Sequence, residues 1–187
     1  MDQRPRMSTI QSSAPPTQTD LAWAAGFFDG EGWVMVTRKR SGDRMRFGLQ
    51  VAVGQTSLEP LEKFQVWFGG RIHRLVDRPR SHPVWQWRVG SWMARAVLQQ
   101  LLPFLVVKRA EAETAIRFQD WMDRPRQRDA SGHRVTLSTE DIRLSEQFRI
   151  EIREIRSART LRSSKREGVI RALASSSQPV EEVPASV

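Results

Sequence analysis

The sequence predicts an α+β fold, in which helices cover one face of an antiparallel sheet. Three observations support this prediction. Helical and strand patterns alternate in the order αββαββα, and further helical patterns follow. The strand patterns come in pairs joined by short polar segments, as in β-hairpins. One strand pattern alternates apolar and polar residues, which leaves one sheet face for a core and the other for solvent.

Two helices are expected in the first half of the domain. The first begins at 17–20, where side chains can cap it, and Gly30 and Gly32 end it. Ser57 is expected to cap the second, which Gly69-Gly70 stops. Apolar residues recur at helical spacing in this second helix: Leu58, Leu61, Phe64 and Phe68.

Each of these helices is followed by a predicted hairpin. The first hairpin has strands at 33–39 and 44–53, and the second at 71–76 and 84–89, with a loop at 77–83. The strand at 44–53 alternates apolar with basic or polar residues, so one face of the sheet is expected to be exposed and basic. We assign to that face Arg38, Arg40, Arg44, Arg46, Arg71, Arg74 and Arg88.

The C-terminal part is expected to be helical. Ser91 caps a third helix that runs to about residue 102, and a fourth covers 107–122. Ser138 or Thr139 caps a long charged helix to about residue 160, and a short helix lies near 164–174.

A single domain at 17–174 is expected between two disordered ends. Residues 1–16 are rich in Ser, Thr, Gln and Pro, and residues 175–187 have a similar composition. No linker long enough to divide the domain lies between them.

The charge balance calls for a polyanionic partner. The 187 residues carry 30 Lys and Arg against 21 Asp and Glu, a net charge of +9. Nucleic acid is the first candidate and an anionic membrane the second. A ribosome-associated or merely Arg-rich protein would have the same charge.

Several classes of protein are excluded by composition. The sequence has no Cys, which rules out disulfides, Cys-based zinc sites and thiol catalysis. No apolar run approaches the ~20 residues of a membrane span, and the N-terminus lacks the apolar core of a signal peptide. We therefore expect an intracellular, cytoplasmic protein, associated with the nucleoid when bound to DNA, and no membrane partner.

The end of the first helix holds the most informative segment. A stripe of small residues ending in an acid would let a second helix approach closely: Ala22, Ala25, Gly26 and Asp29. Glu31 follows, and its carboxylate together with the Gly30 carbonyl would form half of a site for a hard cation such as Mg²⁺. Two such helices side by side would give the paired-metal arrangement used in phosphodiester hydrolysis.

This segment resembles the signature of the LAGLIDADG homing endonucleases. The likeness rests on Ala25-Gly26-Phe27-Phe28-Asp29-Gly30-Glu31-Gly32, on the αββαββα order, and on the L-x-P-F-L-x-x-K pattern of 102–108. It covers about residues 17–174 and implies the family's saddle-shaped antiparallel sheet with extra C-terminal helices.

The resemblance also implies roles for individual residues. Glu31 matches the metal-binding catalytic acid, and Gly30 the residue whose carbonyl also faces the metal. Asp29 matches a motif acid that supports the helix pair without binding metal. Gln55 and Lys108 match catalytic residues that order the attacking water or stabilise charge, with Mg²⁺ as cofactor and Mn²⁺ as an alternative. A basic residue that often follows the glutamine by one turn is missing here.

A single copy of the motif is present, so the two-helix interface would form between two chains of a homodimer. Its target would be a long, roughly palindromic site in double-stranded DNA, cut on both strands. Base-reading side chains would come from the strands: Arg38, Arg40, Arg44, Arg46, Gln50, Arg74, Gln86 and Arg88. His73 would lie among these DNA-facing residues. Arg71, on the same face, is counted with this DNA-binding set.

Two other functions are compatible with the same pattern. A relative that has lost cleavage would act as a DNA-binding regulator, although the presence of Glu31 argues against it. An RNA maturase that assists intron splicing would use a second basic surface, for which the Arg-rich C-terminal helices are candidates.

Overall fold

A computed structural model describes residues 14–42, 44–75, 83–125 and 136–176. Most of the N-terminal segment predicted to be disordered, the 77–82 part of the loop and residues 177–187 lie outside these ranges. Within the described residues, no helix combines the length and apolar character needed to cross a bilayer.

The predicted element order is confirmed. The chain forms α1 (Gln18–Glu31), the strands β1 (Gly32–Ser41) and β2 (Arg44–Gln55), and α2 (Glu59–Phe68). It continues through β3 (Arg71–Arg74), β4 (Trp85–Gly90), α3 (Ser91–Leu101) and the 3₁₀ turn η1 (Leu102–Phe104). Two further helices complete it, α4 (Arg109–Asp123) and α5 (Thr139–Ser176).

The four strands form one antiparallel sheet in the order β1-β2-β4-β3. The β1–β2 hairpin pairs ten residues of each strand, from Gly32 with Val53 to Ser41 with Arg44. β1 is therefore a long edge strand, and β3 is a short one at the opposite edge. This order places the two hairpins side by side with β2 and β4 at the centre.

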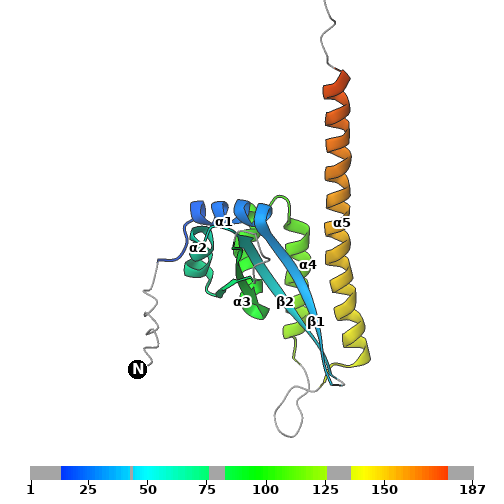
Figure 1. Ribbon diagram of the computed structural model, residues 1–187. Coiled ribbons are helices and arrows are strands. Elements are labelled where there is room, and N and C mark those ends of the chain that lie inside the picture. The colour runs from blue at the N-terminus through cyan, green and yellow to red at the C-terminus, as the bar shows by residue number, and fades with distance from the viewer. Residues whose placement is uncertain (1–13, 43, 76–82, 126–135, 177–187) are drawn as a thin grey trace, which may run out of the picture.

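Helices cover one face of the sheet and form a single core with it (Figure 1). Phe28 of α1, Phe64 of α2 and Trp87 of β4 have no exposed surface. The Trp87 indole donates a hydrogen bond to the Gly69 carbonyl (2.7 Å), which satisfies the only polar atom of that buried ring. Gly69 and Gly70 both have positive φ, so this turn favours glycine at both positions.

Two predicted helix caps are wrong. Ser57 does not cap α2: Leu58 holds the N-cap position without a side-chain hydrogen bond, and Pro60 lies in the first turn. Ser91 does not cap α3, because it is the first helical residue after Gly90, with a φ of 53°. In both places the N-cap position falls one residue away from the serine, at Leu58 after Ser57 and at Gly90 before Ser91.

The predicted pair of C-terminal helices is a single helix. α5 runs without a break from Thr139 to Ser176, lies along one side of the domain and projects beyond it (Figure 1). Its end also moves the predicted start of the disordered tail, since residues 175 and 176 are helical. The serines near 163 lower helix propensity only slightly, and this is too little to end a helix.

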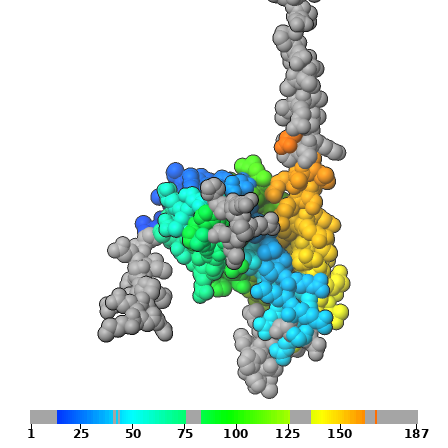
Figure 2. Space-filling view, viewed as in Figure 1, coloured from blue at the N-terminus to red at the C-terminus, as the bar shows by residue number. Residues whose placement is uncertain are grey.

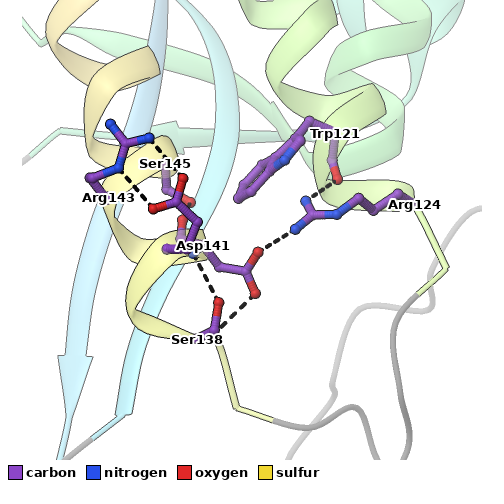
Figure 3. Close-up of polar contacts among 7 residues, drawn as sticks. Trp121, Arg124, Ser138, Asp141, Arg143 and Ser145 are labelled. Atoms are coloured by element: carbon purple, nitrogen blue, oxygen red, sulfur yellow. Dashed lines mark hydrogen bonds and ion pairs between the residues drawn. The ribbon is translucent and has the colours of Figure 1, made fainter.

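The first turn of α5 is fixed by a reciprocal cap (Figure 3). The Asp141 amide donates to the Ser138 hydroxyl (3.0 Å), and the Ser138 amide donates to the Asp141 carboxylate (3.2 Å). The same carboxylate pairs with Arg124, whose guanidinium lies 4.0 Å from the centre of the Trp121 ring at the end of α4. The prediction that Ser138 or Thr139 caps this helix is thus confirmed for Ser138.

Candidate active site and nucleic-acid interface

The helix-to-strand junction of α1 and β1 presents the predicted metal ligands. Glu31 is the last residue of α1, and both Glu31 and Gly30 are exposed. Carbonyls in the last turn of a helix lack helical partners, so the Gly30 oxygen is a candidate ligand of the hard type that Mg²⁺ prefers. Gly32 is required at the junction, because a Cβ there would lie 2.2 Å from the Phe28 ring.

Asp29 points the other way, into the protomer. Its carboxylate accepts hydrogen bonds from the backbone amides of Val106 (2.8 Å), Val107 (3.0 Å) and Lys108 (2.8 Å). The motif acid therefore clamps the segment between η1 and α4 onto the end of α1. Its predicted place at a helix–helix interface is untested, but its carboxylate is already engaged within the chain.

Lys108 is held by the same clamp. Its side chain is nearly buried, with 5% exposed, and its ammonium donates to the Asp29 carbonyl. Burial lowers the pKa of Lys108, and Arg159 lowers it further, against the opposite pull of Asp29, Glu111 and Glu31. The amine that the sequence pattern identified thus lies beside the acidic end of α1.

A buried carboxylate next to Lys108 was missed by the sequence analysis. Glu111 has no exposed surface, and burial raises its pKa while Arg159 and Arg156 of α5 oppose that shift. Arg159 Nη1 lies 2.9 Å from Glu111 Oε1, yet neither carboxylate oxygen has an aligned hydrogen bond within the described part of the chain. The contact is a charge pair with poor hydrogen-bond geometry.

A signal for Glu111 was present in the sequence. It stands at the core spacing of α4, four residues before Ala115 and seven before Phe118, both of which are apolar. A carboxylate in an apolar stripe predicts a buried charge that needs a partner. The partner, however, lies in α5, about fifty residues further along the chain.

Gln55 lies at the same end of the sheet as Glu31. It is the last residue of β2, two positions beyond Val53, which pairs with Gly32. Its amide oxygen accepts from the backbone and hydroxyl of Thr56 (2.7 and 3.1 Å). The fold therefore brings Glu31, Lys108 and Gln55 to one end of the protomer.

The predicted small-residue stripe is only partly exposed. Ala22 and Gly26 face outward, and a Cβ at Gly26 would meet no atom within 4 Å. Ala25 is fully buried in the core of its own protomer. A second chain could therefore contact Ala22 and Gly26, whereas Ala25 shapes the inner side of α1.

The sheet face opposite the helices carries most of the predicted DNA-binding residues. Strand register places them together with Thr37 and Lys39, which the sequence analysis had not assigned. The predicted members on this open face are Arg44, Arg46, Gln50, Arg71, His73, Gln86 and Arg88.

Three of the predicted arginines lie on the wrong side for this face. Arg38 and Arg40 pair with Phe47 and Met45, which belong to the helix-covered face, and Arg74 pairs with Trp85. Alternation along β1 places Arg38 and Arg40 on the same face as the apolar residues that precede them in that strand. Their expected place on the open face is therefore wrong, because residue type and position along the strand do not decide which face a side chain occupies, whereas alternation does.

A polar network lines the middle of the open face. With its amide oxygen turned toward Arg88, Gln50 accepts from Nη1 (3.2 Å) and Nε (3.1 Å) of that guanidinium. Arg88 Nη2 is also 3.5 Å from His73 Nε2. These residues, with Arg71, Thr37 and Lys39, surround a hollow of about 390 Å³. Donors and acceptors held in this way can read the edges of bases in a groove.

No protein-family model and no curated protein matches this sequence. Solved structures do match. The homing endonuclease I-CvuI, in complex with uncleaved DNA in the presence of magnesium, has a TM-score of 0.58 at 19% identity, over 74% of this chain and 82% of that chain. The archaeal intron-encoded homing endonuclease I-Vdi141I, complexed with DNA, also has a TM-score of 0.58, at 16% identity over 73% and 84%.

A third match is the LAGLIDADG homing endonuclease I-GzeII in complex with its DNA target, with a TM-score of 0.51 at 19% identity. It covers 71% of this chain and 43% of that chain. Together these matches show that the chain has the fold of the LAGLIDADG homing endonucleases. The fold inferred from the sequence is therefore confirmed.

Proposed function

We propose that the protein is a metal-dependent, sequence-specific DNA endonuclease that makes double-strand breaks as a homodimer. The observation that carries this proposal is the exposed Glu31 carboxylate at the end of α1, beside the buried Lys108. DNA complexes of proteins with the same fold support a double-stranded DNA partner. Because its substrate would be DNA, the protein would act inside the cell.

The open sheet face is the proposed DNA-reading surface. Its arginines, His73 and the amides of Gln50 and Gln86 would contact base edges and phosphates in a major-groove half-site. We add Lys39 and Thr37 to these proposed DNA-contacting residues, because both lie on the open face and line its hollow.

Glu31 and the Gly30 carbonyl fit a hard divalent cation, and we propose Mg²⁺, with Mn²⁺ as an alternative. The I-CvuI complexes with DNA were obtained in the presence of magnesium in one case and calcium in another, which is consistent with a divalent requirement. A bound cation would polarise the scissile phosphate and activate water. Lys108 would stabilise charge near that phosphate, and Gln55 would orient the attacking water.

One protomer supplies only part of such a site. Among the described residues, no three His, Asp or Glu side chains gather in a way that could hold a metal. A carboxylate and a carbonyl cannot fill an octahedral shell, so further ligands would come from a second Glu31 and from DNA. Pairing two protomers through Ala22 and Gly26 of α1 would bring the acids together and make the target roughly palindromic.

The test is cleavage of a randomised-site DNA pool with Mg²⁺. Wild type is expected to cut a subset of sites, and Glu31→Gln to lose at least about a hundredfold in rate while still binding DNA. Glu62→Gln, which removes one exposed carboxylate from α2, is the matched control and should cut normally.

Each other outcome identifies a competing function. If wild type binds DNA tightly without cutting, the protein is a DNA-binding regulator. If it prefers folded RNA, it is a maturase. Unchanged cleavage by Glu31→Gln would refute the proposed active site.

A further inference from the structure

Two of the three arginines that are absent from the open face, Arg38 and Arg40, line a groove of their own. Arg38 and Arg40 project from the helix side of β1. On that side, the β1–β2 hairpin lies against the first half of α5 (Figure 2). The groove has a volume of about 650 Å³. Its walls are formed by Met35, Val36, Thr37, Arg38, Lys39, Arg40, Met45 and Arg149.

The charge of this β1–α5 groove is strongly positive. Four of its eight lining residues are Arg or Lys. The acid beside it is Glu146, whose carboxylate lies 2.5 Å from Arg149 and 3.8 Å from Arg38. The hydrogen bond from Arg149 lowers the pKa of Glu146 against the effect of burial, and Arg38 and Arg153 lower it further. Glu146 therefore stays charged and holds the arginine forks at the groove.

The groove continues the open face around the edge of the sheet. Thr37 and Lys39 line both the groove and the hollow on the open face. β1 is an edge strand, so among the strands that the structure describes none separates the two surfaces. Further along this edge, Arg156 of α5 donates to the Val34 carbonyl (2.5 Å), which keeps α5 against β1.

We propose that the β1–α5 groove binds the phosphodiester backbone of the DNA duplex whose bases lie on the open face. Arginine forks and a lysine, with few acceptors between them, suit phosphate oxygens better than base edges. A DNA strand that extends from the open face past the β1 edge would bring its phosphates next to these arginines and the lysine. α5 thus becomes part of the DNA-binding surface. This inference rests on the proposed function.

Glu146 occupies, in the free protein, the position that a phosphate would take. It pairs with two groove arginines, both partly exposed, at 53% for Arg38 and 31% for Arg149. Binding of the backbone would exchange this internal carboxylate for a phosphate. We therefore expect that removal of the groove cations lowers the affinity for DNA, whereas removal of the Glu146 carboxylate raises it.

The experiment measures binding to a mixed-sequence duplex in EDTA, as a function of salt. Arg38→Ala combined with Arg149→Ala should reduce the slope of log affinity against log salt by about 2, one unit for each lost phosphate contact. Glu146→Gln should increase affinity and steepen the slope by up to about 1. The control is Lys63→Ala with Arg143→Ala, two exposed cations outside the groove.

The proposal is overturned if the groove variant has the wild-type salt slope. It is also overturned if the control variant reduces that slope as much as the groove variant does. It also fails if the groove variant binds DNA normally but loses binding to a structured RNA of equal length. The assay needs no cleavage, so an inactive Glu31 site would not affect it. If wild type bound no DNA at all, the proposed function would fall together with the groove. Circular dichroism confirms that each variant is folded, and Glu146→Gln retains both arginines.

Discussion

Asp29 and Glu31 are two residues apart, yet the structure gives them different surroundings. Three backbone amides surround the Asp29 carboxylate, whereas Glu31 is exposed at the helix end. A carboxylate that accepts several amide bonds stabilises the fold, and an exposed one is free to bind a ligand. The motif thus combines a structural acid with a functional one.

At the residue scale, Asp29→Asn is expected to lower the free energy of unfolding by about 2–3 kcal/mol. The amide keeps one acceptor where three donors converge, and its NH₂ group would face them. Glu31→Gln should change stability by no more than about 0.5 kcal/mol, because this side chain is exposed. Urea denaturation followed by circular dichroism measures both variants. Equal stability of Asp29→Asn and wild type would show that the clamp contributes nothing.

At the scale of elements, α5 matters because its contacts reach the candidate site. It supplies the arginines beside Glu111 and, through Arg156, contacts β1 at the Val34 carbonyl. Its own start is fixed by Ser138, Asp141 and Arg124 (Figure 3). Loosening this first turn would therefore loosen a helix that contacts both β1 and the neighbourhood of Lys108.

The cap at Asp141 predicts an acid-sensitive element. Burial opposes ionisation there, but hydrogen bonds from Ser138 and Arg124 outweigh it, and the pKa of Asp141 falls below its usual value. A lowered folded-state pKa means that this stabilisation is present above about pH 4 and is lost as pH falls through the folded-state pKa. Asp141→Asn should cost about 1–2 kcal/mol at neutral pH and remove this part of the acid dependence.

Denaturation at a series of pH values tests this expectation. Glu140→Gln is the control, since within the described ranges that exposed carboxylate pairs with exposed Arg143 in the same turn. The control should be close to wild type in both stability and acid response. Identical pH profiles for wild type and Asp141→Asn would contradict the assignment.

At the scale of the whole molecule, the proposed active site depends on a second protomer. A Cβ at Gly26 meets no atom within 4 Å, so a larger side chain fits the isolated chain. Gly26→Leu should stabilise α1 by up to about 1 kcal/mol through helix propensity, yet it should block close approach of a second α1.

Sedimentation and cleavage assays together measure this prediction. The Gly26→Leu protein should be folded, monomeric and inactive, whereas Gly26→Ala, which keeps a small side chain, should associate more nearly as wild type does. A Gly26→Leu protein that still dimerises and cuts DNA would rule out this helix face as the interface.

The sequence determined what depends on local pattern. Apolar periodicity set the element order, and the pairing of strands in hairpins gave the sheet. The motif at the end of α1 located Glu31, and the L-x-P-F-L-x-x-K pattern located Lys108. The parity of Arg38 and Arg40 could also have been read from Val34 and Val36, because alternation along a strand is a local rule.

Only the tertiary structure decided what joins distant segments. The Arg156 contact with Val34 spans 122 residues, and the pairs Arg159–Glu111 and Glu146–Arg38 likewise join α5 to elements far back in the chain. No local pattern encodes such pairs, because they depend on where a long helix docks. The position in which α5 docks is decided by the summed burial of many side chains. That position in turn determines the surroundings of Lys108 and forms the basic groove at the sheet edge.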